Sequence, residues 1–338
     1  MSALAADGVA IMLLISVAVY SVAGGTDYGA GIWDLLAGGP QGGAHVRRLI
    51  DHAMAPVWEA NNVWLAFAAV LAWTGFPLLF QSAFASLYPL FTVALLGLIL
   101  RGAFFAFRKI SSTPGSHRAA SIVFGVSSVL APFCFAAVLG AIASGRIGVG
   151  GPVVPVWQAC LNPTSVMFGL VALAATAFSG ASFLTGDARR YGTGDLVGYF
   201  RWRAIVAGVA TLVVGAGALA VMHVDTPAVF DGMVAGRGLP FAAVAVAATL
   251  AVIVLLWRRQ FHWFRVLTVA GVGAFVFAWG FGQSPYLLPG RLTIAQGAGA
   301  PSTQVFVLVV SVVAIVLVTP SLALLYALDQ RNDLTPEE

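Results

Sequence analysis

The stretch LPFAAVAVAATLAVIVLLW, residues 239–257, contains no charged side chain. A helix of about 20 apolar residues crosses the hydrocarbon core of a bilayer, so this stretch predicts a membrane-spanning helix. Similar runs recur along the chain, separated by glycine- and proline-rich breaks. The nine predicted spans are roughly 7–27, 53–74, 78–107, 118–143, 163–185, 202–222, 239–257, 263–282 and 303–328. We therefore expect residues 1–338 to form a single, all-α integral membrane domain.

The composition of the whole chain agrees with this interpretation. Its mean hydropathy is +0.94 and only 9% of its residues are charged, whereas soluble domains carry about 25% charged residues. Such a chain needs lipid as its solvent. The net charge of +4 comes from few and scattered basic residues, which excludes a nucleic-acid-binding surface. The first basic residue is Arg47, so the first span lacks the positive region of a signal peptide and is expected to be retained.

The basic residues also predict the orientation of the spans, because cytoplasmic connections are enriched in Arg and Lys. Of the 17 basic residues, 13 fall in one set of connections and the C-terminal tail. Only Arg146, Arg237 and Arg291 fall in the alternate set, and Arg101 lies inside a span. This asymmetry places the N-terminus outside and the C-terminus in the cytoplasm, which requires an odd number of spans.

Glu59 is an acid placed inside a predicted span. It lies six residues from the cytoplasmic end of the second span, or about 9 Å at 1.5 Å per residue. Polar or amphipathic side chains surround it in the sequence: Trp58, Asn61, Asn62 and Trp64. Asn62 shares the helix face of Glu59. Charges inside a bilayer are costly and indicate function, so this face should turn to the protein interior.

Three more ionisable residues are expected close to Glu59. Arg101 lies at a similar depth in the third span, and the short link at 75–77 makes the second and third spans antiparallel neighbours. An ion pair between Arg101 and Glu59 is therefore geometrically natural. Asp27 ends the first span, and Asp34 shares its face if that helix continues. Acids and an arginine should thus converge near the cytoplasmic surface.

The residues alone leave two interpretations of this cluster open. It is either a structural group of ion pairs that ties three helices together, or a proton relay that carries protons inward from the cytoplasm. The histidines give no support for a haem in this chain, because all five fall in connections or at helix ends: His45, His52, His117, His223 and His262. The sequence also lacks the ligand spacing of a zinc or binuclear metal site. Cys134 and Cys160 are read as two free apolar thiols, with a disulfide as the alternative.

Several motifs resemble those of a known family. The run HAMAPVWEANNVWL, residues 52–65, followed by Phe76-Pro77, resembles the second-helix signature of subunit II of the cytochrome bd quinol oxidases. GTDYGAG, residues 25–31, is similar to the end of the family's first helix, and LRGAFFAFR, residues 100–108, to its third-helix end. Leu161-Asn162-Pro163 matches the start of its fifth helix. The resemblance covers most of the chain.

The resemblance implies a fold of nine transmembrane helices, in two four-helix bundles plus one peripheral helix. It implies a heterodimer with a haem-binding subunit I that holds haems b and d, with no redox centre in this chain. Asp27 and Glu59 match acidic positions on the family's proton path from the cytoplasm. Trp64 matches a tryptophan associated with the oxygen route in some members, and Arg101 matches a structural arginine. Gly24 stands where some members carry a second acid, which suggests a branch related to the cyanide-insensitive oxidases.

Three functions are weighed from the sequence. The first is subunit II of a bd-type terminal quinol:oxygen oxidoreductase in a bacterial cytoplasmic membrane, which scaffolds subunit I and supplies protons. A structural quinone in this chain and a small single-helix subunit in the complex are left open. The second is a proton-coupled secondary transporter, although transporters usually carry polar groups at the midplane. The third is a purely structural assembly subunit.

Overall fold

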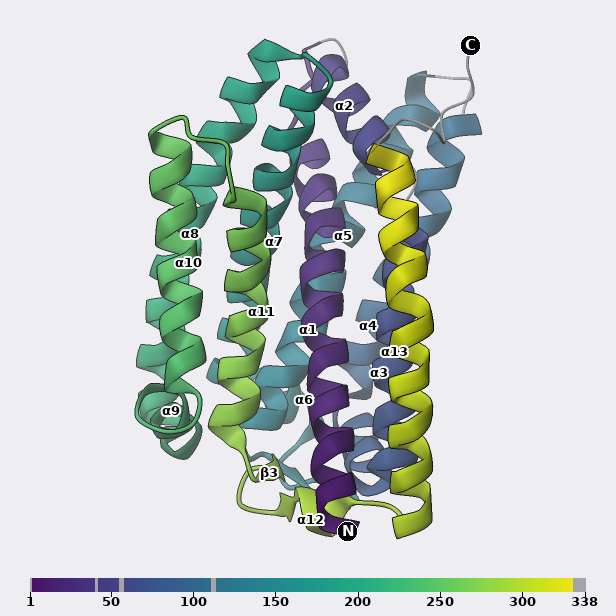
Figure 1. The fold of residues 1–338 in the computed structure, drawn as a ribbon, viewed down its shortest axis with the longest axis vertical. Helices are drawn as coiled ribbons and strands as arrows, with labels where there is room; N and C mark the ends of the chain where they lie inside the picture. The colour runs from purple at the N-terminus through teal and green to yellow at the C-terminus, as the bar shows by residue number, and fades with distance from the viewer. Residues whose placement is uncertain (1, 40–41, 55–57, 111–113, 331–338) are drawn as a thin grey trace.

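The computed structural model describes residues 2–39, 42–54, 58–110 and 114–330, and it consists of long helices that run along one axis (Figure 1). The long helices are α1 (Ser2–Leu35), α3 (Trp58–Gly75), α4 (Pro77–Ile110), α5 (Pro114–Ala143), α7 (Pro163–Arg190), α8 (Gly194–Asp225), α10 (Leu239–Trp257), α11 (Phe264–Gln283) and α13 (Pro301–Gln330). Short elements connect them: α2 (Ala44–Met54), β1 (Ile147–Gly148), β2 (Gly151–Pro152), α6 (Val156–Cys160), α9 (Pro227–Val234), β3 (Tyr286–Leu288), β4 (Leu292–Thr293) and α12 (Ile294–Gly297).

Eight of these helices are long and apolar enough to cross a membrane within the described residues. The chain is therefore an integral membrane protein, as its composition predicts. The helix that corresponds to the second predicted span, α3, is not among the eight and has 18 residues. The count of nine crossings and the orientation of the termini stay predictions.

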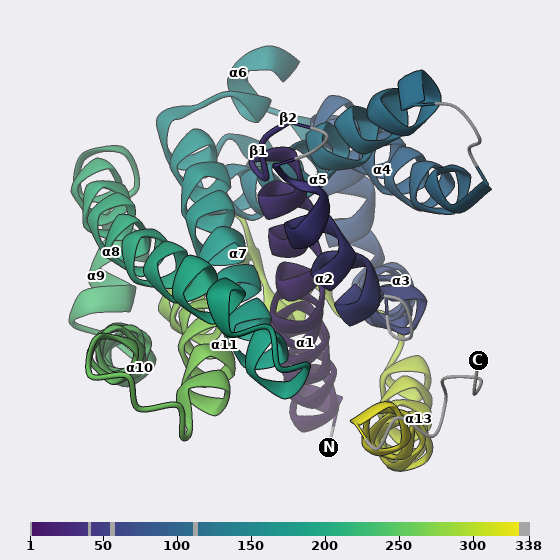
Figure 2. The same cartoon turned by 90° about the horizontal axis from the view of Figure 1, so that it is seen from above.

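The long helices form one packed array, in which two groups of four follow each other along the chain. In one group, α1 contacts α3 and α5, and α4 packs along α5 and contacts α3. In the other, α7 packs along α8, α10 packs along α11, and contacts between α8 and α10 and between α7 and α11 close the set. Contacts of α1 with α7 and α11, and of α5 with α7, join the groups, while α13 packs on α1 and α3 and lies at the edge of the molecule (Figure 2).

Glycines allow the two groups to approach closely. A Cβ added at Gly29 of α1 would meet the backbone of α7, with the Gly180 Cα and N atoms 2.8 Å away. The backbones of α1 and α7 therefore touch at this crossing, which is how small residues pack helices in membranes. Trp33 strengthens the same crossing, because its indole N–H donates to the Ala177 carbonyl at 2.8 Å.

Two predicted helix ends change in the structure. The first helix continues to Leu35, well beyond the expected end near residue 27. Asp34 therefore lies in α1 and, seven residues after Asp27, shares its helix face. The second span was expected to begin at residue 53, but residues 53 and 54 belong to α2, and α3 begins at Trp58. Charged and apolar residues alternate in α2 with helical spacing, so it buries Val46, Leu49 and Ile50 and is not part of an apolar span.

Candidate functional site

Asp27 lies on α1 and receives a hydrogen bond from a neighbouring helix. The Asn61 side-chain amide of α3 donates to the Asp27 carboxylate and, at 3.4 Å, to the Ala23 carbonyl one turn earlier on α1. Asn61 is buried and Asp27 is half-buried. A carboxylate inside a helical bundle needs such a donor, since water is scarce there. This hydrogen bond joins the polar residues of α1 and α3.

Arg101 lies in the same interior, on α4. Its side chain is only 3% exposed, and its Nε donates to the Ser128 hydroxyl of α5 at 3.2 Å. The guanidinium also lies over the Tyr28 ring of α1 and the Phe124 ring of α5, at 4.9 and 5.1 Å from the ring centres. Cation–π contacts of this kind stabilise a desolvated arginine. Arg101 thus joins α1, α4 and α5 around one buried positive charge.

Two tyrosines continue the polar cluster along α1. The Tyr20 and Tyr28 hydroxyl oxygens are 2.7 Å apart, and both side chains are buried. The two residues are eight positions apart, so the side chains lean along the helix toward each other, and Gly24 between them has no side chain to separate the rings. The hydroxyl pair therefore lies next to the Tyr28 ring that Arg101 contacts.

Asp34 lies on α1, seven residues after Asp27 and close to the end of the helix. It is fully buried, and its Oδ1 lies 3.6 Å from Arg47 Nε, on the amphipathic helix α2. Arg47 also donates to the Gly38 carbonyl at 2.6 Å and to the Gly39 carbonyl at 3.3 Å. Arg47 therefore holds the end of α1 against α2. This contact supports a structural role for Asp34 at the turn.

Trp64 packs beside the polar cluster and borders an open groove. It is 8% exposed and belongs to an apolar cluster with Tyr20, Tyr28 and Ala131. The groove has a volume of about 620 Å³ and is lined by apolar side chains of α1, α3, α10, α11 and α13, with Asn61 and Thr319 as polar members. Asn61 therefore contacts Asp27 on one side and borders the groove on the other.

Comparison with known proteins identifies the family. A model of the family described as "Cytochrome bd terminal oxidase subunit II" matches residues 6–328. The chain belongs to this family. The structure of bd oxidase from Geobacillus thermodenitrificans contains a chain with the same fold, at 21% sequence identity and a TM-score of 0.79, covering 96% of this chain and 98% of that chain. No match is found among the curated proteins.

The absence of a haem ligand from this chain stays a prediction. No group of three His, Cys, Asp or Glu side chains among the described residues could hold a metal. His45 pairs with Asp195, and His223 lies edge-on to Phe230 with ring centres 4.9 Å apart. The side chain of His117 lies outside the described residues.

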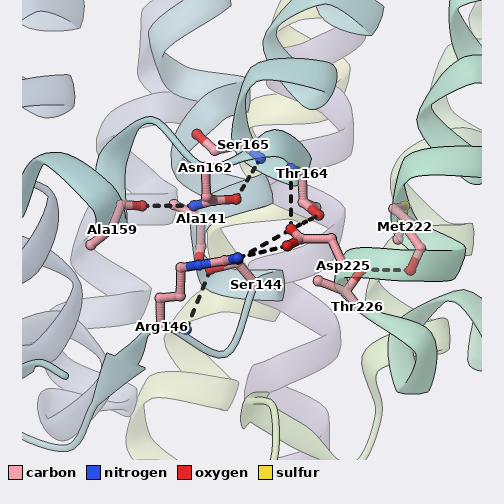
Figure 3. A network of polar contacts seen from close by, with 10 residues as sticks. All are labelled: Ala141, Ser144, Arg146, Ala159, Asn162, Thr164, Ser165, Met222, Asp225 and Thr226. Carbon is pink, nitrogen blue, oxygen red and sulfur yellow. Dashed lines mark hydrogen bonds and ion pairs between the residues drawn. The ribbon is translucent and has the colours of Figure 1, made fainter. Parts of the chain in front are cut away.

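At the end of the molecule where α1 begins, subunit II has a polar network that sequence reasoning missed (Figure 3). Arg146 donates two hydrogen bonds to the Asp225 carboxylate, at 2.6 and 3.1 Å. The Thr164 hydroxyl donates to the same carboxylate at 2.6 Å, and Asn162 caps α7 by accepting from Ser165 N. The network fixes the connection before α7 to the end of α8. The sequence indicated this network only weakly, because Arg146 is an isolated arginine in a connection that is poor in basic residues.

Parts of the predicted site stay untested. The side chains of Trp58 and Glu59 lie outside the described residues, so the ion pair of Glu59 with Arg101 remains a prediction. The backbone of Glu59 lies in the first turn of α3, rather than six residues inside a helix. Asn62 is half-buried. The cysteines are confirmed as free, buried thiols, and burial raises the pKa of Cys160, which lies outside the spans.

Proposed function

We propose that this chain is the haem-free subunit of a bd-type quinol:oxygen oxidoreductase, and that it supplies protons from the cytoplasm to a haem-bearing partner. The observation that carries this proposal is the half-buried carboxyl of Asp27, which accepts a hydrogen bond from Asn61 in the same interior as the buried charge of Arg101. A bilayer-embedded protein keeps ionisable groups mainly where a partner or a moving proton uses them.

The proton would enter at the inner end of α1 and reach Asp27. Asn61 donates to the carboxylate and so holds it in one position. A carboxyl that releases and regains a proton can hand it on without any redox chemistry of its own. Glu59 and Asp34 are the other acids proposed for this path.

The second proposed role is to scaffold the partner. We propose a heterodimer with a haem-binding subunit I that carries haems b and d, in a bacterial cytoplasmic membrane. The N-terminus would lie outside and the C-terminus in the cytoplasm. The first residue of α1 and the last of α13 lie at opposite ends of the molecule, which supports an odd number of crossings (Figure 1). The groove beside Trp64 is the place proposed for an apolar guest such as oxygen or a quinone tail.

The experiment is Asp27→Asn in the complete oxidase, with oxygen consumption measured from acidic to alkaline pH. The variant keeps the shape of the side chain but cannot carry a proton, so turnover should fall by about tenfold or more at neutral pH. The defect should lessen at low pH, where protons are abundant. Asp231→Asn is the matched control, since Asp231 is an exposed acid of α9.

Haem absorbance of the purified complex separates the two roles. If Asp27→Asn keeps the partner's haems and its turnover and pH profile match those of Asp231→Asn, the proton-path proposal is wrong. If the partner's haems are lost, Asp27 acts in assembly. Glu59→Gln measured in the same way tests the role of Glu59.

A further inference from the structure

The connection between α10 and α11 carries charge and aromatic surface that the proposed function does not use. It reads RRQFHW over residues 258–263 and contains no acid. Arg258, Arg259, His262 and Trp263 are all exposed, and Trp263 is 74% exposed. The connection joins two apolar spans, so it lies where the chain leaves the hydrocarbon core.

Within the part of the chain that the structure describes, no acid pairs with the two arginines of this connection. Two acids of the adjoining helices have other partners: Asp187 of α7 pairs with Arg265, and Asp195 of α8 pairs with His45. Among the described residues, neither Arg258 nor Arg259 forms an ion pair. Both guanidinium groups therefore stay available to an anion from outside the chain.

The backbone holds Arg259 in a conformation that usually belongs to glycine. Its φ is 56°, and the bonds Arg259 N to Leu256 O and Gln260 N to Leu255 O form the complete Schellman motif at the end of α10. Trp263 also has a positive φ, of 62°. Bulky residues rarely occupy this region. Their presence at two positions of one short connection indicates that the side chains themselves are needed there.

Two exposed tryptophans lie next to these arginines. Trp257 ends α10 and is 64% exposed, and its ring centre is 6.2 Å from that of Trp202 on α8. Arg201 of α8 donates to the Leu256 carbonyl at 3.0 Å and so fixes α8 against the end of α10. Tryptophan is the typical residue of the membrane–water interface, where it contacts the headgroup region of lipids.

Below the tryptophans, toward the middle of the spans, the exposed faces of α8 and α10 are aliphatic. Val206, Val209 and Val213 are exposed on α8, and Leu250 and Val254 on α10. From the connection inward, the surface therefore presents guanidinium groups, then indole rings, then aliphatic side chains. A phospholipid with an anionic headgroup has the same order of phosphate, glycerol and acyl chains.

We propose that Arg258, Arg259, Trp257 and Trp202 form a binding site for one anionic phospholipid. The two guanidinium groups bind the headgroup phosphate, the indoles pack on the glycerol region, and the acyl chains follow the aliphatic faces of α8 and α10. The negative charge of the headgroup distinguishes this lipid from a zwitterionic one, because neither arginine pairs with an acid among residues 2–39, 42–54, 58–110 and 114–330.

The test measures lipid retention by the complete, delipidated oxidase using native mass spectrometry, with phosphatidylglycerol or phosphatidylcholine added back. Phosphatidylglycerol should bind the unmodified oxidase more tightly than phosphatidylcholine. The double variant Arg258→Gln, Arg259→Gly should bind it roughly 30-fold more weakly. Glycine suits the conformation at position 259, so this variant should keep its fold and its haem absorbance.

Arg237→Gln is the matched control, because Arg237 is an exposed arginine at the opposite end of the molecule, and it should retain the lipid as the unmodified oxidase does. Three results would overturn the proposal. These are unchanged retention in the double variant, equal retention of phosphatidylcholine, or displacement of the lipid by millimolar inorganic phosphate, which would indicate a simple anion site.

Discussion

Asp27 depends on a donor from another helix, so its environment can be changed by substituting a single neighbour. Asn61→Ala removes the amide that bonds the Asp27 carboxylate. Leaving a buried polar group without its partner costs about 1–3 kcal/mol. We expect a lower thermal midpoint of the purified complex and slower oxygen reduction. The adjacent Asn62→Ala is the control, since Asn62 has no side-chain hydrogen bond among the described residues; equal effects of the two substitutions would count against the specific role of Asn61.

Sequence reasoning reached some of these residues and missed others for a physical reason. Asp27, Asn61 and Arg101 were predicted because polar groups are rare and costly in apolar spans. The Tyr20–Tyr28 pair was missed, because a tyrosine in such a span is also a common packing residue. The contact of Asp34 with Arg47 was also missed, because it depends on the turn between α1 and α2. That turn follows from local backbone geometry and not from helical spacing.

At the scale of elements, the crossing of α1 and α7 depends on the absence of a side chain at Gly29. A methyl group there would contact the α7 backbone at Gly180. Overpacking of this kind costs about 1–3 kcal/mol, so Gly29→Ala should lower the thermal midpoint of the complex. Gly215→Ala in α8 is the matched control, since a Cβ at Gly215 meets nothing within 4 Å. There alanine should be neutral or stabilise the helix by up to about 1 kcal/mol. A stable Gly29→Ala variant would show that the helices separate easily at this crossing.

The presence and length of each helix were easier to predict than its rotation about its own axis, which decides the face that it buries. The run 239–257 was predicted with the ends that α10 has, since charge and length define a span. The face that each helix buries was not predictable in the same way, because lipid-facing and buried faces are equally apolar and give no amphipathic pattern. The pairing of Arg146 with Asp225 also escaped prediction, because it joins residues far apart in the chain through irregular connections.

At the scale of the whole molecule, the arginine distribution predicts that Arg237 faces outward and Arg259 faces the cytoplasm. Both residues are exposed, at opposite ends of the molecule, and either can be replaced by cysteine in a background with Cys134→Ser and Cys160→Ser. A membrane-impermeant maleimide should label Arg237→Cys in intact cells and Arg259→Cys only after lysis.

The native cysteines provide an internal check of the same experiment. Cys134 and Cys160 are buried, and the raised pKa of Cys160 keeps less of its thiol in the reactive thiolate form at neutral pH. The unsubstituted protein should therefore stay unlabelled until it is unfolded. Labelling of Arg259→Cys in intact cells, with Arg237→Cys protected until lysis, would reverse the orientation. The proposed proton entry would then face the outside, and Asp27 could not draw protons from the cytoplasm.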